Sequence, residues 1–212
     1  MNQFLFVTSW LVPLYGLVGA ILALPWAMGI IRRTGPRPAA YFNLLTTVLA
    51  FAHSLYVFKD IWDREQVNVL LHWFTACDLD LSFALEISPV SIGTSVLITG
   101  LSLLAQIYAL GYMEKDWALA RFFALMGFFE AALSGLAISD SLFLSYALLE
   151  VLTLSTYLLV GFWYAQPLVV TAARDAFLTK RVGDLLLLMG VVTLSSLAGS
   201  LNFSDLYEWA QT

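Results

Sequence analysis

The sequence predicts an all-α polytopic membrane protein with six transmembrane helices and a short external β-hairpin between helices 2 and 3. Hydrophobic residues make up 60% of the 212 residues, charged residues make up 12%, and the mean hydropathy is +0.83. Six separate segments are apolar over about the 20 residues that a membrane-spanning helix needs. Charged residues gather in the connections between these segments. This composition is typical of a membrane protein rather than of a soluble domain with a large core.

The predicted spans are separated by polar or glycine- and proline-rich connections. The first apolar segment lacks a basic leading region and a cleavage site, so we expect a retained helix rather than a signal peptide. We expect the whole chain, 1–212, to form a single membrane domain. The spans are expected at residues 7–30, 40–58, 90–111, 117–138, 141–163 and 178–199.

The long connection between the second and third spans is expected to hold the hairpin, over residues 66–88. Residues 79–88 read LDLSFALEIS, a strict alternation of apolar and polar side chains. That period is typical of a half-buried strand. Residues 66–74 are the expected partner strand. We interpret the hairpin as an ordered cap on the outer surface.

Basic residues predict the orientation in the membrane. Eight of the ten lysines and arginines lie in the links 31–39, 112–121 and 164–181. By the positive-inside rule these links face the cytoplasm or its equivalent, and the N-terminus faces the opposite side.

Several function classes are excluded. The chain has no basic run, so a nucleic-acid partner is not expected. We expect lipids to surround the apolar helices. Cys77 is the only cysteine, which excludes an internal disulfide and an iron–sulfur cluster held by this chain alone. We also find no nucleotide-binding fingerprint. Any redox chemistry must therefore occur on partner proteins.

Glu150 is the only charged residue in the segment 141–164. A carboxylate near the middle of a membrane helix is costly, and such residues usually serve ion or proton pathways. Tyr146, Thr153 and Tyr157 follow spacings that place them on the same helical face as Glu150. We interpret this stripe as a path for protons. The alternative is an accident of packing.

Glu130 in the fourth span is a second intramembrane acid. Counted from the same side of the membrane, it lies at a depth similar to that of Glu150. If the two face each other, they form a carboxylate pair with coupled titrations. If Glu130 is rotated away, it has no such role.

Arg181 and Asp184 lie near the start of the sixth span, three residues apart, so they could pair on one face. The alternative for the basic residues here is interfacial anchoring by snorkelling side chains. Asp184 fits that alternative poorly, because it lies deeper.

These residue types suit proton transfer. Burial favours the protonated form of a glutamate, and a nearby cation favours the ionised form. A cation that moves toward or away from Glu150 would switch it between holding and releasing a proton. The mechanism therefore requires a mobile ion-pair partner for Glu150.

The segments ALLEVLTLSTYLLVGFWY and AARDAFLTKRVGD resemble the large antiporter-like membrane subunit of complex I, of the chain 5 type, which is related to multisubunit cation/proton antiporters. The resemblance implies an antiporter-like inverted-repeat fold, incomplete here because members are much longer. It makes Glu150 the central fifth-helix glutamate of the family, and Arg181 and Asp184 the charged pair that follows it. The seventh-helix lysine that pairs with this glutamate is expected beyond residue 212.

The resemblance implies a proton-translocating subunit of a quinone reductase driven by NAD(P)H or ferredoxin. No cofactor is expected on this chain. Quinone or plastoquinone, NAD(P)H or ferredoxin, and iron–sulfur clusters would bind partner subunits, and the neighbours would include another antiporter-like subunit. The alternatives are a stand-alone sodium/proton antiporter subunit and a docking platform for a soluble enzyme.

Two sequence features resemble the cyanobacterial branch of the family, whose complexes serve CO2 uptake. They are Leu149 before Glu150 and the segment LTLSTYLLVGFWYAQPLVV. This resemblance implies a thylakoid membrane with a luminal N-terminus. It also implies a hydrophilic CO2-hydrating partner, docked on the cytoplasmic side at Arg37, Tyr41 and Glu114. Glu114 could help to hold a metal such as zinc at that interface. The alternative is a solvated acid beside Lys115.

Overall fold

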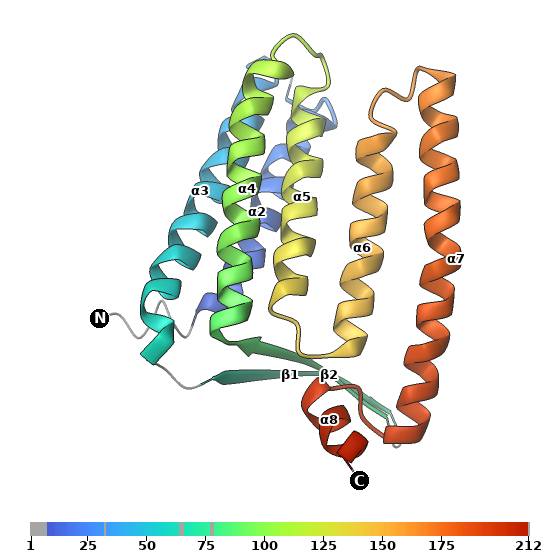
Figure 1. Cartoon of the computed structure of the whole chain (residues 1–212). Helices are drawn as coiled ribbons and strands as arrows, with labels where there is room; N and C mark the ends of the chain where they lie inside the picture. The colour runs from blue at the N-terminus through green and yellow to red at the C-terminus, as the bar shows by residue number, and fades with distance from the viewer. Residues whose placement is uncertain (1–7, 32, 64–65, 77–78, 212) are drawn as a thin grey trace. The chain divides into compact units, whose positions relative to one another are not determined.

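The computed structural model describes residues 8–31, 33–63, 66–76 and 79–211, so Arg32, Arg64 and Cys77 lie outside the described residues. Six described helices are long and apolar enough to cross a membrane, which confirms the predicted fold class (Figure 1). A short 3-10 helix, η1 (Ser9–Leu11), precedes the first. The helices are α2 (Val12–Ala27), α3 (Arg37–Asp60), α4 (Pro89–Tyr112), α5 (Leu119–Ala137), α6 (Leu142–Val160) and α7 (Pro167–Ala198).

Local sequence explains where α4 begins. Ser88 adopts an extended backbone and accepts a hydrogen bond from the backbone N–H of Ser91, while the Ser91 hydroxyl oxygen accepts one from the backbone N–H of Ser88. This reciprocal cap satisfies two backbone donors at the helix start. Pro89 follows at the first helical position, where its missing N–H costs nothing.

α7 begins at Pro167, well before the predicted span 178–199. Its 32 residues extend over about 48 Å at 1.5 Å per residue, against about 30 Å for the hydrocarbon core of a bilayer. Hydropathy identifies only the apolar part of such a helix. The first turns, which contain Arg174, therefore lie outside the expected span although they belong to the same helix.

The predicted hairpin is confirmed. β1 (Val67–Ala76) pairs antiparallel with β2 (Leu79–Ile87), with Val67 opposite Ile87 and a register irregularity between His72 and Phe74.

In β2, Leu85 and Ile87 are buried, as the alternation predicts. Ala84 is buried as well, although the pattern placed it on the polar face. The connection before α6 pairs with this strand, since Asp140 N–H donates to the Ala84 carbonyl over 2.8 Å.

One element was not predicted. α8 (Phe203–Gln211) follows a turn in which the Ser200 hydroxyl donates to Asp205 over 2.6 Å. Asp205 lies in the first turn of the helix, where a negative charge is favourable. The helix is short and amphipathic, so it gives no apolar segment of span length.

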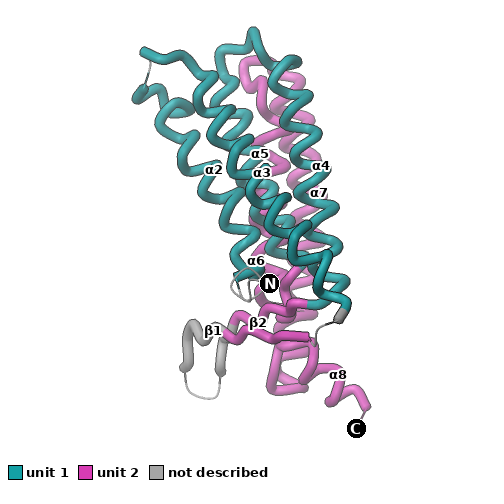
Figure 2. Tube along the Cα trace, turned by 90° about the vertical axis from the view of Figure 1, so that its left-hand side faces the viewer, with its two compact units in different colours: residues 1–65, 88–137 teal, residues 66–87, 138–212 magenta. Residues whose placement is uncertain are grey.

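The chain divides into two compact units, residues 1–65 with 88–137 and residues 66–87 with 138–212 (Figure 2). The single membrane domain stays a prediction. Unit 2 contains the hairpin, α8 and the neighbouring helices α6 and α7.

Unit 1 is a bundle of α2, α3, α4 and α5. Its interior is lined by small side chains and by polar side chains. Among the small ones, Ala23, Ala39, Ala120 and Ala124 form a core cluster. The outward side of α4 is apolar and exposed, for example at Leu97 and Leu101. Small residues between helices and apolar residues outside are typical of a bundle surrounded by lipid.

Gly127 permits the close approach of α5 to α2. A Cβ at this position would lie 2.8 Å from the carbonyl oxygen of Gly16 and 3.1 Å from the backbone nitrogen of Ala20. Both contacts are with backbone atoms, which cannot rotate away. A side chain larger than hydrogen would therefore push the two helices apart.

We expect Gly127→Ala to lower the stability of unit 1 by about 1–3 kcal/mol, the usual cost of overpacking a core. Thermal unfolding of the detergent-solubilised protein measures the change. Gly111→Ala on α4 is the matched control, because a Cβ there meets nothing within 4 Å. Equal unfolding temperatures for the two variants would contradict this packing argument.

Asp140, in the connection between α5 and α6, is buried, and its backbone carbonyl accepts a hydrogen bond from Phe203 N–H. Burial raises the pKa of the Asp140 carboxyl, and the nearby charges of Glu86 and Asp205 raise this pKa further. A raised pKa in the folded state means stability that is present in acid and lost as pH rises through that pKa.

Asp140→Asn is therefore expected to raise the thermal unfolding temperature at neutral pH, and the gain should shrink as pH falls. Asp175→Asn, at an exposed position, is the control and should show no comparable pH-dependent gain. If the Asp140→Asn variant were less stable than wild type at neutral pH, the ionised carboxylate would be the favoured form there.

Candidate functional site

Glu150 on α6 forms an ion pair with Arg181 on α7. The hydroxyl of Tyr146, one helical turn before Glu150, donates to the other carboxylate oxygen over 2.9 Å. The side chains of Glu150 and Arg181 are 25% and 42% exposed within the described chain. The intramembrane acid thus has both a cation and a hydroxyl beside it.

The geometry of two neighbouring helices produces this pair. Tyr146 and Glu150 are four residues apart, so they share one face of α6. On α7, the Arg181 guanidinium lies 5.4 Å from the centre of the Phe177 ring, four residues earlier. This cation–π contact favours a guanidinium directed along α7.

Asp184 is buried, and the Thr153 hydroxyl lies 3.4 Å from one of its carboxylate oxygens. Thr153 also donates to the carbonyl of Leu149 over 2.8 Å. Among the described residues, Arg181 and Asp184 therefore contact α6 rather than each other. The pairing within α7 expected from their spacing is not the arrangement observed, because a partner on α6 is available to each.

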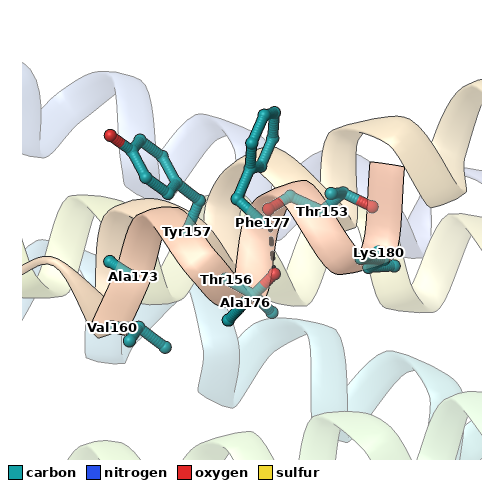
Figure 3. Close-up of a pocket in the computed structure, with 8 residues that line it drawn as sticks. All are labelled: Thr153, Thr156, Tyr157, Val160, Ala173, Ala176, Phe177 and Lys180. Carbon is teal, nitrogen blue, oxygen red and sulfur yellow. Dashed lines mark hydrogen bonds between the residues drawn. The ribbon is translucent and has the colours of Figure 1, made fainter. Parts of the chain in front are cut away.

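Tyr157, the last residue of the predicted stripe, lies at a cavity instead of in the ion-pair cluster. Its ring packs against Phe177, with ring centres 5.1 Å apart. The cavity between α6 and α7 has a volume of about 130 Å³ and a mainly apolar lining. Figure 3 shows its lining, Thr153, Thr156, Tyr157, Val160, Ala173, Ala176, Phe177 and Lys180.

Glu130 lies inside unit 1 and is only 2% exposed. One of its oxygens, Oε2, accepts three hydrogen bonds from neutral side chains of α3 and α4. The donors are Thr47 at 2.7 Å, Ser102 at 2.5 Å and Gln106 Nε2 at 3.1 Å. Glu130 and Glu150 belong to different compact units, and their pairing stays a prediction.

The three residues expected at a docking surface lie in unit 1. Arg37 at the start of α3 forms an ion pair with Glu114, in the turn after α4, and both side chains are largely exposed. Tyr41, one turn along α3, is exposed as well. The described residues contain no group of three histidine, cysteine, aspartate or glutamate side chains that could hold a metal.

Sequence reasoning missed two features of these sites. The partner of Glu150 lies 31 residues away on another helix, and no local pattern indicates which charged residue reaches it. The donors to Glu130 had a partial signal. Ser102 and Gln106 belong to a polar stripe with Ser91, Ser95 and Thr99, which fits helix packing equally well.

Two family models match the chain. Residues 73–123 match the model described as NADH-ubiquinone oxidoreductase (complex I), chain 5 N-terminus. Residues 139–212 match the transmembrane model described as NADH:quinone oxidoreductase/Mrp antiporter. The second match contains Glu150, Arg181 and Asp184.

Relatives extend the match to nearly the whole chain. The chain is 59% identical over 204 residues to NAD(P)H-quinone oxidoreductase subunit 5, organellar chromatophore 2, of Paulinella chromatophora, covering 95% of this chain and 33% of that protein. It is 35% identical to the chloroplastic subunit 5 of Aethionema cordifolium and of Citrus sinensis, covering 94% of this chain and 27% of each relative. The chain thus spans a third or less of the length of these curated relatives.

The helices found here and these relatives identify an integral membrane protein. Its two matched segments account for more than half of the chain. The chain belongs to the family of antiporter-like chain 5 membrane subunits of complex I.

Proposed function

We propose that this chain translocates protons as part of a quinone-reducing complex, with Glu150 as the proton carrier. The observation that carries the proposal is the ion pair between Glu150 and Arg181, held between two apolar helices with Tyr146 beside it. Placing a charged pair within a membrane costs free energy, and such groups usually mark ion or proton pathways.

Arg181 is the mobile cation that the mechanism needs. It lies on α7 three residues from Asp184, so a guanidinium that swings along its own helix exchanges one carboxylate for another. While Arg181 contacts Glu150, the ionised glutamate is favoured. When Arg181 turns to Asp184, Glu150 takes up a proton.

The cavity between α6 and α7 provides the approach for that proton. Thr153 contacts Asp184 and also lines the cavity. Water in the cavity would thus lie within one helical turn of Glu150.

Electron transfer is assigned to partner subunits. The relatives are named as subunits of NAD(P)H-quinone oxidoreductase from chloroplasts and a chromatophore. We therefore infer a partnership with further membrane subunits, and with subunits that carry the iron–sulfur clusters and bind NAD(P)H or ferredoxin and plastoquinone. We place the complex in a thylakoid membrane, with the N-terminus in the lumen.

Unit 1 is consistent with this orientation. The ion pair of Arg37 and Glu114 joins the connections α2–α3 and α4–α5. The α2–α3 connection contains Arg32 and Arg33, which the positive-inside rule assigns to the cytoplasmic side, and the ion pair keeps the α4–α5 connection on that side.

In the intact complex, Glu150→Gln is expected to abolish most proton translocation while assembly is preserved, because glutamine keeps the shape of the side chain but cannot carry the proton. Light- or donor-driven acidification in membrane vesicles measures the effect. Glu208→Gln, an exposed position on α8, is the matched control and should pump normally.

Normal pumping by the Glu150→Gln complex would refute the role of Glu150. The stand-alone antiporter is distinguished by its driving ion. Sodium-driven proton exchange by vesicles that lack the redox subunits would identify that alternative.

A second candidate function, docking of a soluble partner, rests on the exposed cluster of Arg37, Tyr41 and Glu114. An exposed ion pair of this kind contributes little to stability, about 0–1 kcal/mol. An aromatic side chain and an arginine close together are typical of the residues that dominate protein interfaces. We propose that a hydrophilic CO2-hydrating protein binds here, with Glu114 as a ligand of a shared zinc ion.

The double substitution Arg37→Ala and Tyr41→Ala is expected to detach this partner and abolish CO2 uptake, while proton translocation continues. Truncating one residue that dominates an interface typically costs about 2 kcal/mol or more of binding free energy. Co-purification with the complex measures retention of the partner. Arg174→Ala, which breaks an exposed ion pair with Asp175, is the control, and a partner retained by the double variant would exclude this surface.

A further inference from the structure

Glu130 has hydrogen bonds on only one side of its carboxyl group. Oε2 accepts three bonds, from Thr47, Ser102 and Gln106. The other oxygen, Oε1, is buried and has no partner among the described residues. An ionised carboxylate accepts equally well at both oxygens, whereas a carboxylic acid accepts at its carbonyl oxygen and donates from its hydroxyl. The observed asymmetry is that of the acid.

The surroundings contain acceptors that lack a donor. Gln106 Oε1 and Asn43 Oδ1 are buried without a hydrogen-bond partner in the described structure. The nitrogen of the same Gln106 amide lies 3.1 Å from Glu130 Oε2, so its oxygen belongs to the same cluster. A hydroxyl on Glu130 Oε1 supplies a donor to this cluster, directly or through an internal water.

The charges around Glu130 favour the same state. Its side-chain partners on α3 and α4 are all neutral. The other buried ionisable side chain described in unit 1 is His53 on α3, which lies 3.3 Å from the hydroxyl of Tyr15 on α2. An ionised carboxylate in a membrane interior without a cation is costly, so such a group neutralises instead.

We propose that Glu130 holds a proton at rest, as a neutral carboxylic acid whose Oε2 is the carbonyl acceptor and whose Oε1 is the hydroxyl donor. With Thr47, Ser102 and Gln106 it forms a proton-binding site inside unit 1. This site differs from Glu150 in kind, because Glu150 is ionised against an arginine. The inference concerns the resting protonation of Glu130 and does not require proton translocation by Glu150.

Infrared spectroscopy of the purified intact complex at neutral pH tests the proposal. In the difference spectrum between wild type and Glu130→Gln, we expect the loss of a protonated-carboxyl C=O band that shifts in D2O. Glu150→Gln should leave this band in place. Loss of a carboxylate band in its stead, or no change in the protonated-carboxyl region, would overturn the proposal.

A second variant keeps Glu130 in place and guards against failed assembly. Thr47→Val conserves shape but removes one hydrogen bond to the carbonyl oxygen, so the band should move to higher frequency. Thr94→Val on α4 is the control, because the Thr94 hydroxyl bonds the Val90 carbonyl of its own helix. An unmoved band in the Thr47→Val complex would show that Glu130 does not carry this carbonyl.

Discussion

The structure depends on one constraint, the high free energy of a charge without a partner in a medium that holds no water. Two glutamates on the six long helices illustrate this constraint. Glu150 meets it with a cation from the neighbouring helix. Glu130 meets it with three neutral donors and, we propose, a proton. The two glutamates are therefore expected to exist in different ionisation states, set by which neighbours each helix brings close.

The same constraint arranges unit 1 with its polar side inward. The buried faces of α3 and α4 carry hydroxyl and amide groups, while leucines cover the outside of α4. Glycines such as Gly127 let the helices approach until backbone contacts backbone, which strengthens dispersion between helices where lipid removes the hydrophobic driving force. Unit 1 is thus a tightly packed bundle around buried polar groups.

The functions that we propose separate three tasks. In that proposal the pair of Glu150 and Arg181, with Asp184 nearby, takes up and releases a proton. A carboxyl enclosed by polar side chains of α3 and α4 suits a proton that is held. The exposed end of unit 1, with Arg37 and Glu114, suits contact with another protein. The chain spans a third or less of its relatives, and the function that we propose assigns electron transfer to other subunits.

The sequence by itself determined the six helices and the hairpin, because hydropathy and alternation are local signals, and its isolated charge made Glu150 a candidate site. It also contained segments that resemble the family, and the two matches to family models confirm this resemblance. Tertiary structure decided the partners. Arg181 reaches Glu150, Thr153 reaches Asp184, and α3 and α4 enclose Glu130. It also revealed that α7 begins eleven residues before its apolar span and that α8 follows it. These features could not be predicted from the sequence, because a contact between helices depends on their rotation and depth. The periodicity of side chains along one helix does not determine either.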